Sequence, residues 1–200
     1  MIGVVDYEAG NVSSVANALT TIGCVFKLSG KMEELSHCDG IILPGVGAAQ
    51  GAMASLEQRQ LIGFLSTLKV PFLGICLGMQ LLYESSEEGS TKCLGVLPGV
   101  VKKFDASRLK VPHMGWNSVE HNAQSMLMSG IPTNDHFYFA HSYYVAIDGW
   151  TCGTSNENDS FSSVIQKKNY FGVQFHPEKS GKSGLLVLNN FVSLCASSRR

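Results

Sequence analysis

The first half of the chain alternates short apolar runs with segments of helical periodicity, and this alternation constrains its fold most strongly. The apolar runs cover residues 2–5, 24–28, 41–43 and 72–75. Strands that alternate with helices along a chain form a parallel sheet with helices on both faces. We therefore predict an α/β fold with a mostly parallel sheet flanked by helices.

Helical patterns fill the intervals between these runs. The first helix is predicted over residues 12–22, where Asn11 can cap its N-terminus and Gly23 can end it. Residues 48–68 are predicted to be largely helical, and a further helix is predicted over residues 77–84. Strands thus end where helices begin, and ligands bind at this edge of open parallel sheets.

The second half of the chain has a different pattern. Aromatic and β-branched residues between turn signals predict antiparallel strands over residues 95–169, added to the parallel core. A strand is predicted over residues 170–175, and a terminal helix follows Gly181 with an apolar stripe formed by Leu185, Leu188, Val192 and Cys195. No internal repeat or linker divides the sequence, so residues 1–200 are expected to form a single domain.

Composition excludes several classes of function. A formal net charge of −1 provides no basic footprint for nucleic acid, and no apolar run approaches the ~20 residues of a membrane helix. The N-terminus lacks the succession of features that marks a secretion signal, so we expect a soluble, cytoplasmic protein. The six cysteines are scattered without zinc-site spacing, so we expect reduced thiols, no metal site and no cofactor.

One cysteine has a distinctive setting. Cys76 lies in the sequence Gly74-Ile75-Cys76-Leu77-Gly78, between an apolar run and a helical segment. Flanking glycines permit the strained turn that lifts a nucleophile clear of a sheet. At a helix N-terminus the oriented N–H groups favour the thiolate, and the N–H of Leu77 is placed to stabilise an oxyanion. The alternative is a structural cysteine in a tight strand-to-helix turn.

A nucleophilic thiol needs a base, and His176 is the best candidate. It follows a predicted strand and precedes Pro177 and Glu178. In an extended segment residues i and i+2 share one side, so Glu178 is expected to approach the imidazole. Cys76, His176 and Glu178 therefore predict a catalytic triad. His37, His121 and His136 are interpreted as surface residues, whereas His113 and His141 have aromatic or apolar neighbours and are equally compatible with a structural role.

The sequence Pro44-Gly45-Val46-Gly47 ends the strand that is expected to lie beside the one leading to Cys76. Its glycines let the backbone expose N–H groups. The loop is therefore a candidate for the second oxyanion donor, from Val46 or Gly47. An ordinary strand-to-helix turn is the alternative.

In this order and spacing, these elements resemble the class I glutamine amidotransferases, and the resemblance runs from Asp6 to the terminal helix. Within that class the chain is similar to the glutaminase subunits of imidazole glycerol phosphate synthases. The Pro112 to Asn117 segment is the most discriminating, because other class members share the catalytic motifs without it. The segments that carry the likeness are Gly10-Asn11 with Ser14-Val15, Cys76 to Leu82, Pro112-His113-Met114-Gly115-Trp116-Asn117, His141-Ser142-Tyr143 and Pro177 to Ser180.

The resemblance implies a flavodoxin-like fold and hydrolysis of L-glutamine to glutamate and ammonia. It implies that the glutamine is held by Gln80, Glu88, Ser142 and Tyr143, and that Tyr138 and Lys179 lie toward a partner. That partner is a (βα)₈-barrel cyclase in a heterodimer, which uses the ammonia to make imidazole glycerol phosphate and aminoimidazole carboxamide ribotide in histidine biosynthesis. Because the glutaminase domain accounts for all 200 residues, we expect the acceptor on another chain.

Several alternatives stay open at this point. Glu88 equally suits a solvated helix end, and the family usually has a glycine at the position of Glu8. A glutaminase paralogue that serves another synthase would have the same pattern. A non-catalytic regulatory subunit would keep the fold, but the intact Cys76, His176 and Glu178 argue against it.

Overall fold

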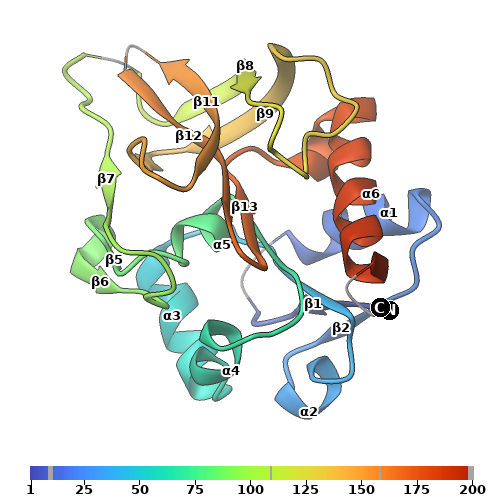
Figure 1. Ribbon diagram of the computed structural model, residues 1–200. Coiled ribbons are helices and arrows are strands. Elements are labelled where there is room, and N and C mark those ends of the chain that lie inside the picture. The colour runs from blue at the N-terminus through green and yellow to red at the C-terminus, as the bar shows by residue number, and fades with distance from the viewer. Residues whose placement is uncertain (9–10, 109, 158, 198–200) are drawn as a thin grey trace.

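A nine-stranded sheet forms the frame of the computed structural model, which describes residues 1–8, 11–108, 110–157 and 159–197. Its strands follow the order β2-β1-β3-β4-β13-β12-β11-β8-β9 (Figure 1). The predicted α/β fold is therefore confirmed. The strands of this sheet that pair in parallel are β2 Phe26–Ser29, β1 Ile2–Val5, β3 Gly40–Leu43, β4 Phe72–Ile75 and β13 Tyr170–Val173.

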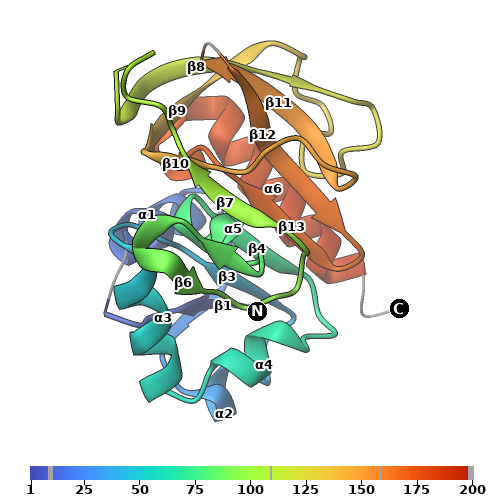
Figure 2. The same cartoon turned by 90° about the vertical axis from the view of Figure 1, so that its left-hand side faces the viewer.

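Antiparallel strands extend the same sheet beyond β13, and Figure 2 shows them rising above the parallel half. They fall within the segment where the sequence predicts antiparallel structure, and they are β12 Asp159–Lys167, β11 Thr151–Glu157, β8 His113–His121 and β9 Asp135–His141. A second, smaller sheet has the order β10-β7-β5-β6, formed by β10 Tyr143–Tyr144, β7 Val100–Lys103, β5 Ser85–Ser86 and β6 Thr91–Lys92.

Helices cover both faces of the parallel half. Neighbouring residues of a strand point to opposite faces, so they pack against different sets of helices. Ile41 and Leu43 of β3 pack in a cluster with residues of α2 Met32–Leu35, α3 Ala49–Gln58 and α4 Ile62–Ser66. Ile42, between them, packs in the cluster that includes residues of α1 Val12–Thr21 and α6 Gly181–Ser197. These two helices lie side by side (Figure 1). β1, β3, β4 and β13 are buried along their whole length, which explains their largely apolar sequences, whereas the edge strand β2 is partly exposed and includes Lys27.

The helix predicted over residues 48–68 is instead divided into α3 and α4. After α3, Gln60 takes a φ of 58°, and Leu61 N donates to Leu56 O at 2.9 Å. A left-handed residue with this return hydrogen bond ends many helices, usually on glycine, and it places Leu56 and Leu61 together in the core. Neither glycine nor proline occupies residues 57–61, so periodicity alone misses the break.

Three smaller expectations are also corrected. The helix predicted over residues 77–84 is regular only in α5 Leu77–Gln80. After α5 the chain turns toward the smaller sheet, and Glu84 N donates to Gly99 O just before strands β5 and β7. Asn11 stands at the N-cap of α1 without a side-chain cap bond. Its neighbour in the motif, Gly10, lies outside the described residues. The strand predicted to begin at residue 24 begins two residues later, at Phe26.

Candidate active site

Cys76 occupies a sharp turn between β4 and α5. Its φ of 52° and ψ of −109° lie where residues other than glycine rarely go. Gly78 approaches β3 so closely that an added Cβ would lie 2.0 Å from Leu43 O. Glycine is therefore required at position 78. The turn holds the Cys76 thiol, 5% exposed, at the carboxyl ends of the parallel strands.

The loop after β3 packs against this turn. An added Cβ on Gly45 would lie 2.5 Å from Gly78 N, so the two segments touch through their backbones. Gly47 has a φ of 91°, and Val46 is 38% exposed. Both residues line the same cavity as Cys76. The loop therefore lines the cavity next to Cys76, and its role as the second oxyanion donor stays a prediction.

His176 follows β13 and pairs with Glu178 on the 3₁₀ turn η2 Pro177–Lys179. His176 Nδ1 lies 2.8 Å from Glu178 Oε1, and the two side chains are 3% and 0% exposed. The contact arises in this turn and not from the strand alternation that predicted it. Asn11 Nδ2 donates to the same carboxylate oxygen at 2.9 Å. Glu178 is therefore fixed from two sides.

The surroundings favour a protonated His176. Burial by itself lowers the pKa of this imidazole, but the hydrogen bonds and negative charges of Cys76 and Glu178 raise the pKa to about 10. Because Nδ1 faces Glu178, Nε2 is the nitrogen left for Cys76. The arrangement thus favours an imidazolium next to Cys76.

A cavity of about 310 Å³ opens beside Cys76 and His176, within the volume range of small-molecule sites. Among the described residues, its lining includes Lys179 but neither Glu178, which lies behind His176, nor Tyr138. It brings together the residues that the sequence assigns to the oxyanion and to the substrate: Val46, Gly47, Leu77, Gln80, Glu88, Ser142 and Tyr143.

Glu88, on the 3₁₀ turn η1 Glu88–Ser90, contacts the helix that follows the loop. Its Oε2 accepts a hydrogen bond at 2.7 Å from the N–H of Ala49, the first residue of α3. The N-cap residue Ala48 has no side-chain oxygen to do this. Glu88 therefore completes the N-terminus of α3 from outside, and the alternative of a simple solvated helix end does not hold.

An exposed group of side chains continues from the cavity lining, which includes Met114 and Lys179. Met114 and Trp116 of β8 are 65% and 58% exposed. The Trp116 ring lies edge-on to Tyr138 at 6.2 Å, and Lys179 Nζ lies 5.8 Å from the Tyr138 ring centroid. We call Met114, Trp116, Tyr138 and Lys179 the apolar rim. Exposed apolar groups of this kind mark interaction surfaces.

His113 and His141 are buried and hydrogen-bond to each other, which agrees with the structural alternative. His113 Nδ1 lies 3.1 Å from His141 Nε2, and His141 Nδ1 lies 2.8 Å from Tyr143 O. Burial lowers the pKa of His141 to about 3 and lowers the pKa of His113 as well. Two neutral rings therefore support the main chain at Tyr143.

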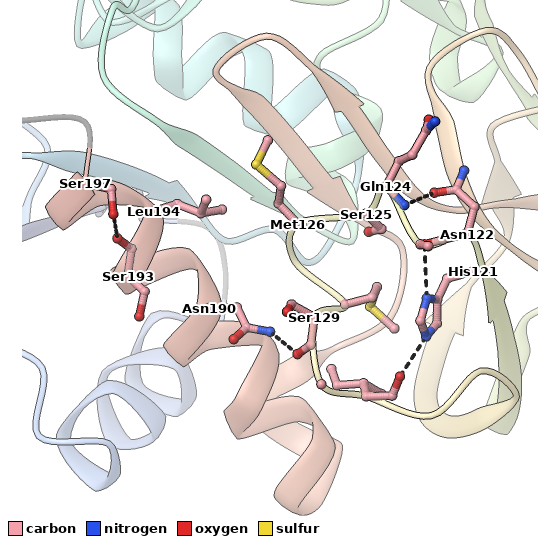
Figure 3. Close-up of a pocket in the computed structure, with 14 residues that line it drawn as sticks. His121, Asn122, Gln124, Ser125, Met126, Ser129, Asn190, Ser193, Leu194 and Ser197 are labelled. Atoms are coloured by element: carbon pink, nitrogen blue, oxygen red, sulfur yellow. Dashed lines mark hydrogen bonds between the residues drawn. The ribbon is translucent and has the colours of Figure 1, made fainter.

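A larger cavity, about 560 Å³, lies between residues 121–131 and α6 (Figure 3). Among the described residues that line it, His121 is the one titratable side chain. Both ring nitrogens of His121 face main-chain oxygens, at 3.4 Å from Asn122 O and 3.0 Å from Ile131 O. This cavity lacks a nucleophile with a free base. Within the described ranges, no group of three or more His, Cys, Asp or Glu side chains is placed to hold a metal ion.

Asn11 and Gln174 bond to side chains of the predicted triad, but the sequence assigns neither of them to the site. Asn11 is predicted as a helix cap, but its amide binds Glu178. Gln174 Nε2 lies 3.6 Å from Cys76 Sγ, and Gln174 is fully buried. Asn11 is visible only as part of a family motif. Nothing in its residue type marks Gln174, two positions before His176, as a contact of the thiol.

Glu8 occupies the position where the family usually has a glycine. Its φ is 63°, a left-handed conformation that glycine adopts without strain. The carboxylate pairs with Arg59, with Nη2 2.7 Å from Oε1. The backbone shape that favours glycine is therefore kept here by another residue.

The fold and this site define a class of enzyme. The family model of glutamine amidotransferase class-I matches residues 3–194, and the chain belongs to that family. Its curated relatives narrow the likeness to the imidazole glycerol phosphate synthase subunits named HisH. The subunit HisH 2 of Legionella pneumophila strain Philadelphia 1 is 45% identical over 195 residues, covering 97% of this chain and 98% of that protein.

Two further relatives carry the same name. The HisH subunit of Haemophilus influenzae strain Rd is 44% identical, covering 96% of both chains. The HisH subunit of Desulfitobacterium hafniense strain DCB-2 is 48% identical, covering 96% of this chain and 93% of that protein.

Solved structures agree on the fold. One, described as a glutamine amidotransferase, has a TM-score of 0.76 at 16% identity and covers 98% of both chains. A chain of PurLQS from Thermotoga maritima has a TM-score of 0.69 at 20% identity, covering 96% of this chain and 97% of that one. At these identities the likeness establishes the fold alone. Among the described residues, no helix is long and apolar enough to cross a bilayer.

Proposed function

We propose that this chain is the glutaminase subunit of an imidazole glycerol phosphate synthase, with Cys76, His176 and Glu178 as its catalytic triad. One observation carries the proposal. The strained Cys76 and the buried His176, paired with Glu178 at 2.8 Å, meet the Val46 and Gly47 loop at one cavity. This constellation suits attack on an amide carbonyl. Family membership and the names of the relatives support glutamine as the substrate.

The first half of the reaction acylates the enzyme. The Cys76 thiolate attacks the side-chain amide carbon of glutamine, which forms the C–S bond and moves the carbonyl electrons onto oxygen. The N–H of Leu77 and an N–H of the Val46–Gly47 loop hold this oxyanion, and one such donor is typically worth ~10²–10³ in rate. The His176 imidazolium then protonates the amide nitrogen, and the C–N bond breaks to release ammonia.

The second half of the reaction returns the enzyme to its starting state. Neutral His176 takes a proton from water, and the resulting hydroxide attacks the γ-glutamyl thioester. The C–S bond breaks, glutamate leaves, and the electron pair returns to Cys76 Sγ. Glu178 keeps His176 in the tautomer with Nδ1 protonated, so that Nε2 transfers the proton in both halves.

The glutamine lies in the 310 Å³ cavity, with its amide at Cys76. Glu88 binds the α-ammonium group, because its carboxylate is the acidic side chain of the lining. Gln80, Ser142 and Tyr143, which also line the cavity, bind the rest of the substrate. These roles follow the family resemblance and agree with the positions of the side chains.

The ammonia passes to a cyclase subunit with a (βα)₈-barrel fold, in a heterodimer that acts in histidine biosynthesis in the cytoplasm. The apolar rim is the docking face, because Met114 and Trp116 of β8 are exposed, Met114 also lines the cavity, and Lys179 adds a positive charge. The cyclase converts its phosphoribosyl substrate and the ammonia to imidazole glycerol phosphate and aminoimidazole carboxamide ribotide. Residues 1–200 act as a single glutaminase domain in this complex.

Replacement of the nucleophile tests the proposal. The Cys76→Ala subunit, bound to the cyclase, is expected to lose glutamine hydrolysis while the complex still makes product from added ammonium chloride. Cys152→Ala is the matched control, because Cys152 is a partly buried cysteine outside the cavity, and it should retain both activities. Continued glutamine hydrolysis by the Cys76→Ala complex would overturn the triad. A wild-type complex that uses only ammonium would instead indicate a non-catalytic subunit.

A further inference from the structure

Gln174 presents a hydrogen-bond donor to the nucleophile. It lies directly after β13, is fully buried, and its Nε2 lies 3.6 Å from Cys76 Sγ. On the other side of the thiol, Ala140 O lies 3.8 Å from Sγ and accepts from the protonated form. The thiol thus has an acceptor for its protonated state and a donor for its ionised state.

The orientation of the Gln174 amide is determined by its neighbour, Gln80. Gln80 Nε2 lies 2.8 Å from Tyr143 O, a carbonyl that can only accept, so the NH₂ group of Gln80 faces it. The same NH₂ group lies 2.9 Å from Gln174 Oε1 and donates its second hydrogen there. Gln174 must therefore present its oxygen to Gln80 and its own NH₂ group to Cys76.

Gln80 is in turn held by the buried histidine pair. Tyr143 O accepts a second hydrogen bond from His141 Nδ1, at 2.8 Å. Because His141 is neutral with its proton on Nδ1, its Nε2 is an acceptor, and His113 Nδ1 donates to it at 3.1 Å. Every donor direction is thus determined, from His113 through Tyr143 O and Gln80 to Gln174.

We propose that Gln174 is a further catalytic residue, whose amide N–H stabilises the Cys76 thiolate, and that Gln80 is the positioning residue that keeps this amide in the donating orientation. The proposal rests on the glutaminase function proposed above. A donor that is already aligned in a buried site stabilises charge without reorganisation during the reaction.

Gln174 acts at two points of the cycle. Before acylation it favours the thiolate over the thiol, so more of the enzyme is ready to attack. During deacylation the C–S bond breaks and its electron pair returns to Sγ, where the Gln174 N–H receives the developing charge. In the thioester between these steps Sγ is neutral, so this hydrogen bond is weakest there.

Replacement of Gln174 by methionine tests the donor, because methionine has a similar length and no N–H. The readout is the pH profile of Cys76 alkylation by iodoacetamide, followed by mass spectrometry of the Cys76 peptide, which requires no glutamine. The midpoint is expected to rise by about one pH unit, since a hydrogen bond to a charged group is lost. His176 and Tyr7, the titratable groups that interact with the thiol, stay unchanged in this variant.

Two further variants complete this test. Gln166→Met is the matched control, because Gln166 is on β12 and its side chain accepts from Met126 N at 3.4 Å. The Cys76 alkylation midpoint of this variant should equal that of the wild type. Gln174→Glu keeps the size and places a carboxylate oxygen beside Sγ, so its midpoint should rise further than that of Gln174→Met. If Gln174→Met does not fold, Gln80→Met carries the test, because a carboxylate at position 174 raises the midpoint by repulsion whether or not the amide donates.

A double-mutant cycle tests the positioning role of Gln80. Gln80→Met should raise the alkylation midpoint in the wild-type background, because the Gln174 amide is then free to rotate. In the Gln174→Met background the same change should have no further effect, since the donor is already absent. Equal effects of Gln80→Met in both backgrounds would contradict the positioning role.

The proposed function and this inference fail in different ways. If the Cys76 midpoint is the same in wild type, Gln174→Met and Gln174→Glu, the donor role of Gln174 is wrong, whatever the glutaminase activity. If wild-type Cys76 is alkylated no faster than Cys152 at every pH, the thiol is not an activated nucleophile and the proposed function itself fails.

Discussion

Glu88 provides the most informative perturbation, because one side chain is assigned to both the substrate and the loop beside the thiol. Its Oε2 accepts from Ala49 N at 2.7 Å, directly after the Val46–Gly47 loop. Glu88→Ala removes both the charge and the acceptor. Glu88→Gln removes the charge but keeps an oxygen that can accept from Ala49. The two variants therefore separate the two roles.

The expected loss of stability follows from the contact. Removal of a helix N-cap costs about 0.5–2 kcal/mol, and Glu88 is half-buried, so we expect about 1 kcal/mol for Glu88→Ala. For a domain of this size that is a decrease in Tm of roughly 2–4 °C. Glu88→Gln should lose less than about 0.5 kcal/mol, because replacement of one acceptor by another at a cap changes little.

The kinetic effects should separate in the same way. Both variants lose the ion pair with the glutamine ammonium group, so KM should rise by at least about tenfold in each. Only Glu88→Ala also releases the start of α3, so only this variant should lower kcat, by roughly tenfold, as the oxyanion donor becomes less well held.

The assay is glutamine hydrolysis by the complex with the cyclase, with thermal unfolding measured on the same preparations. Glu57→Ala and Glu57→Gln are matched controls, because Glu57 is exposed at the other end of α3. Equal kcat and equal Tm for Glu88→Ala and Glu88→Gln would refute the link between Glu88 and the loop.

Three further predictions concern the triad, the buried histidines and the apolar rim. Asn11→Ala should lower kcat about threefold to tenfold with KM unchanged, because Glu178 keeps only the His176 bond; an unchanged kcat would contradict this. His141 has a folded pKa of about 3, so below pH 6.5 the unfolded chain binds a proton that the folded chain does not. Urea unfolding should therefore show that the wild type loses about 2 kcal/mol more than His141→Phe between pH 6.5 and 5, whereas parallel losses would refute the burial argument. Trp116→Ala should weaken cyclase binding at least about tenfold by titration while Tm stays constant, and unchanged affinity would exclude it from the docking face.

The parallel strands were the most predictable part of the fold. β1 and β4 have the predicted bounds, because a strand buried on both faces is a continuous apolar run between polar or glycine-rich turns. The break after α3 was not predictable from such patterns. It depends on Gln60, which adopts a left-handed conformation. The packing of Leu56 and Leu61 in the core offsets the conformational cost of that residue.

Some residues of the candidate site could be predicted from the sequence, and others could not. Cys76 and His176 could be found because each stands in a short motif whose residues lie next to it in the sequence. Asn11 and Glu178 are 167 residues apart, so only the fold reveals their hydrogen bond. Asn11 does stand at the predicted N-cap position, but its side chain binds Glu178 and makes no cap bond. Gln174 is equally hidden, since its contact with Cys76 depends on β13 pairing with β4.

We propose above that Cys76 hydrolyses glutamine and that the ammonia is used by another chain. The most direct test measures the rate of glutamine hydrolysis by this chain alone, with the cyclase, and with the cyclase bound to its nucleotide substrate. We expect slow hydrolysis alone and an acceleration of at least ~10² with the ligand-bound cyclase, the typical value of one oxyanion donor brought into place. A rate that is already high in the isolated chain and unchanged by cyclase and nucleotide would contradict the account.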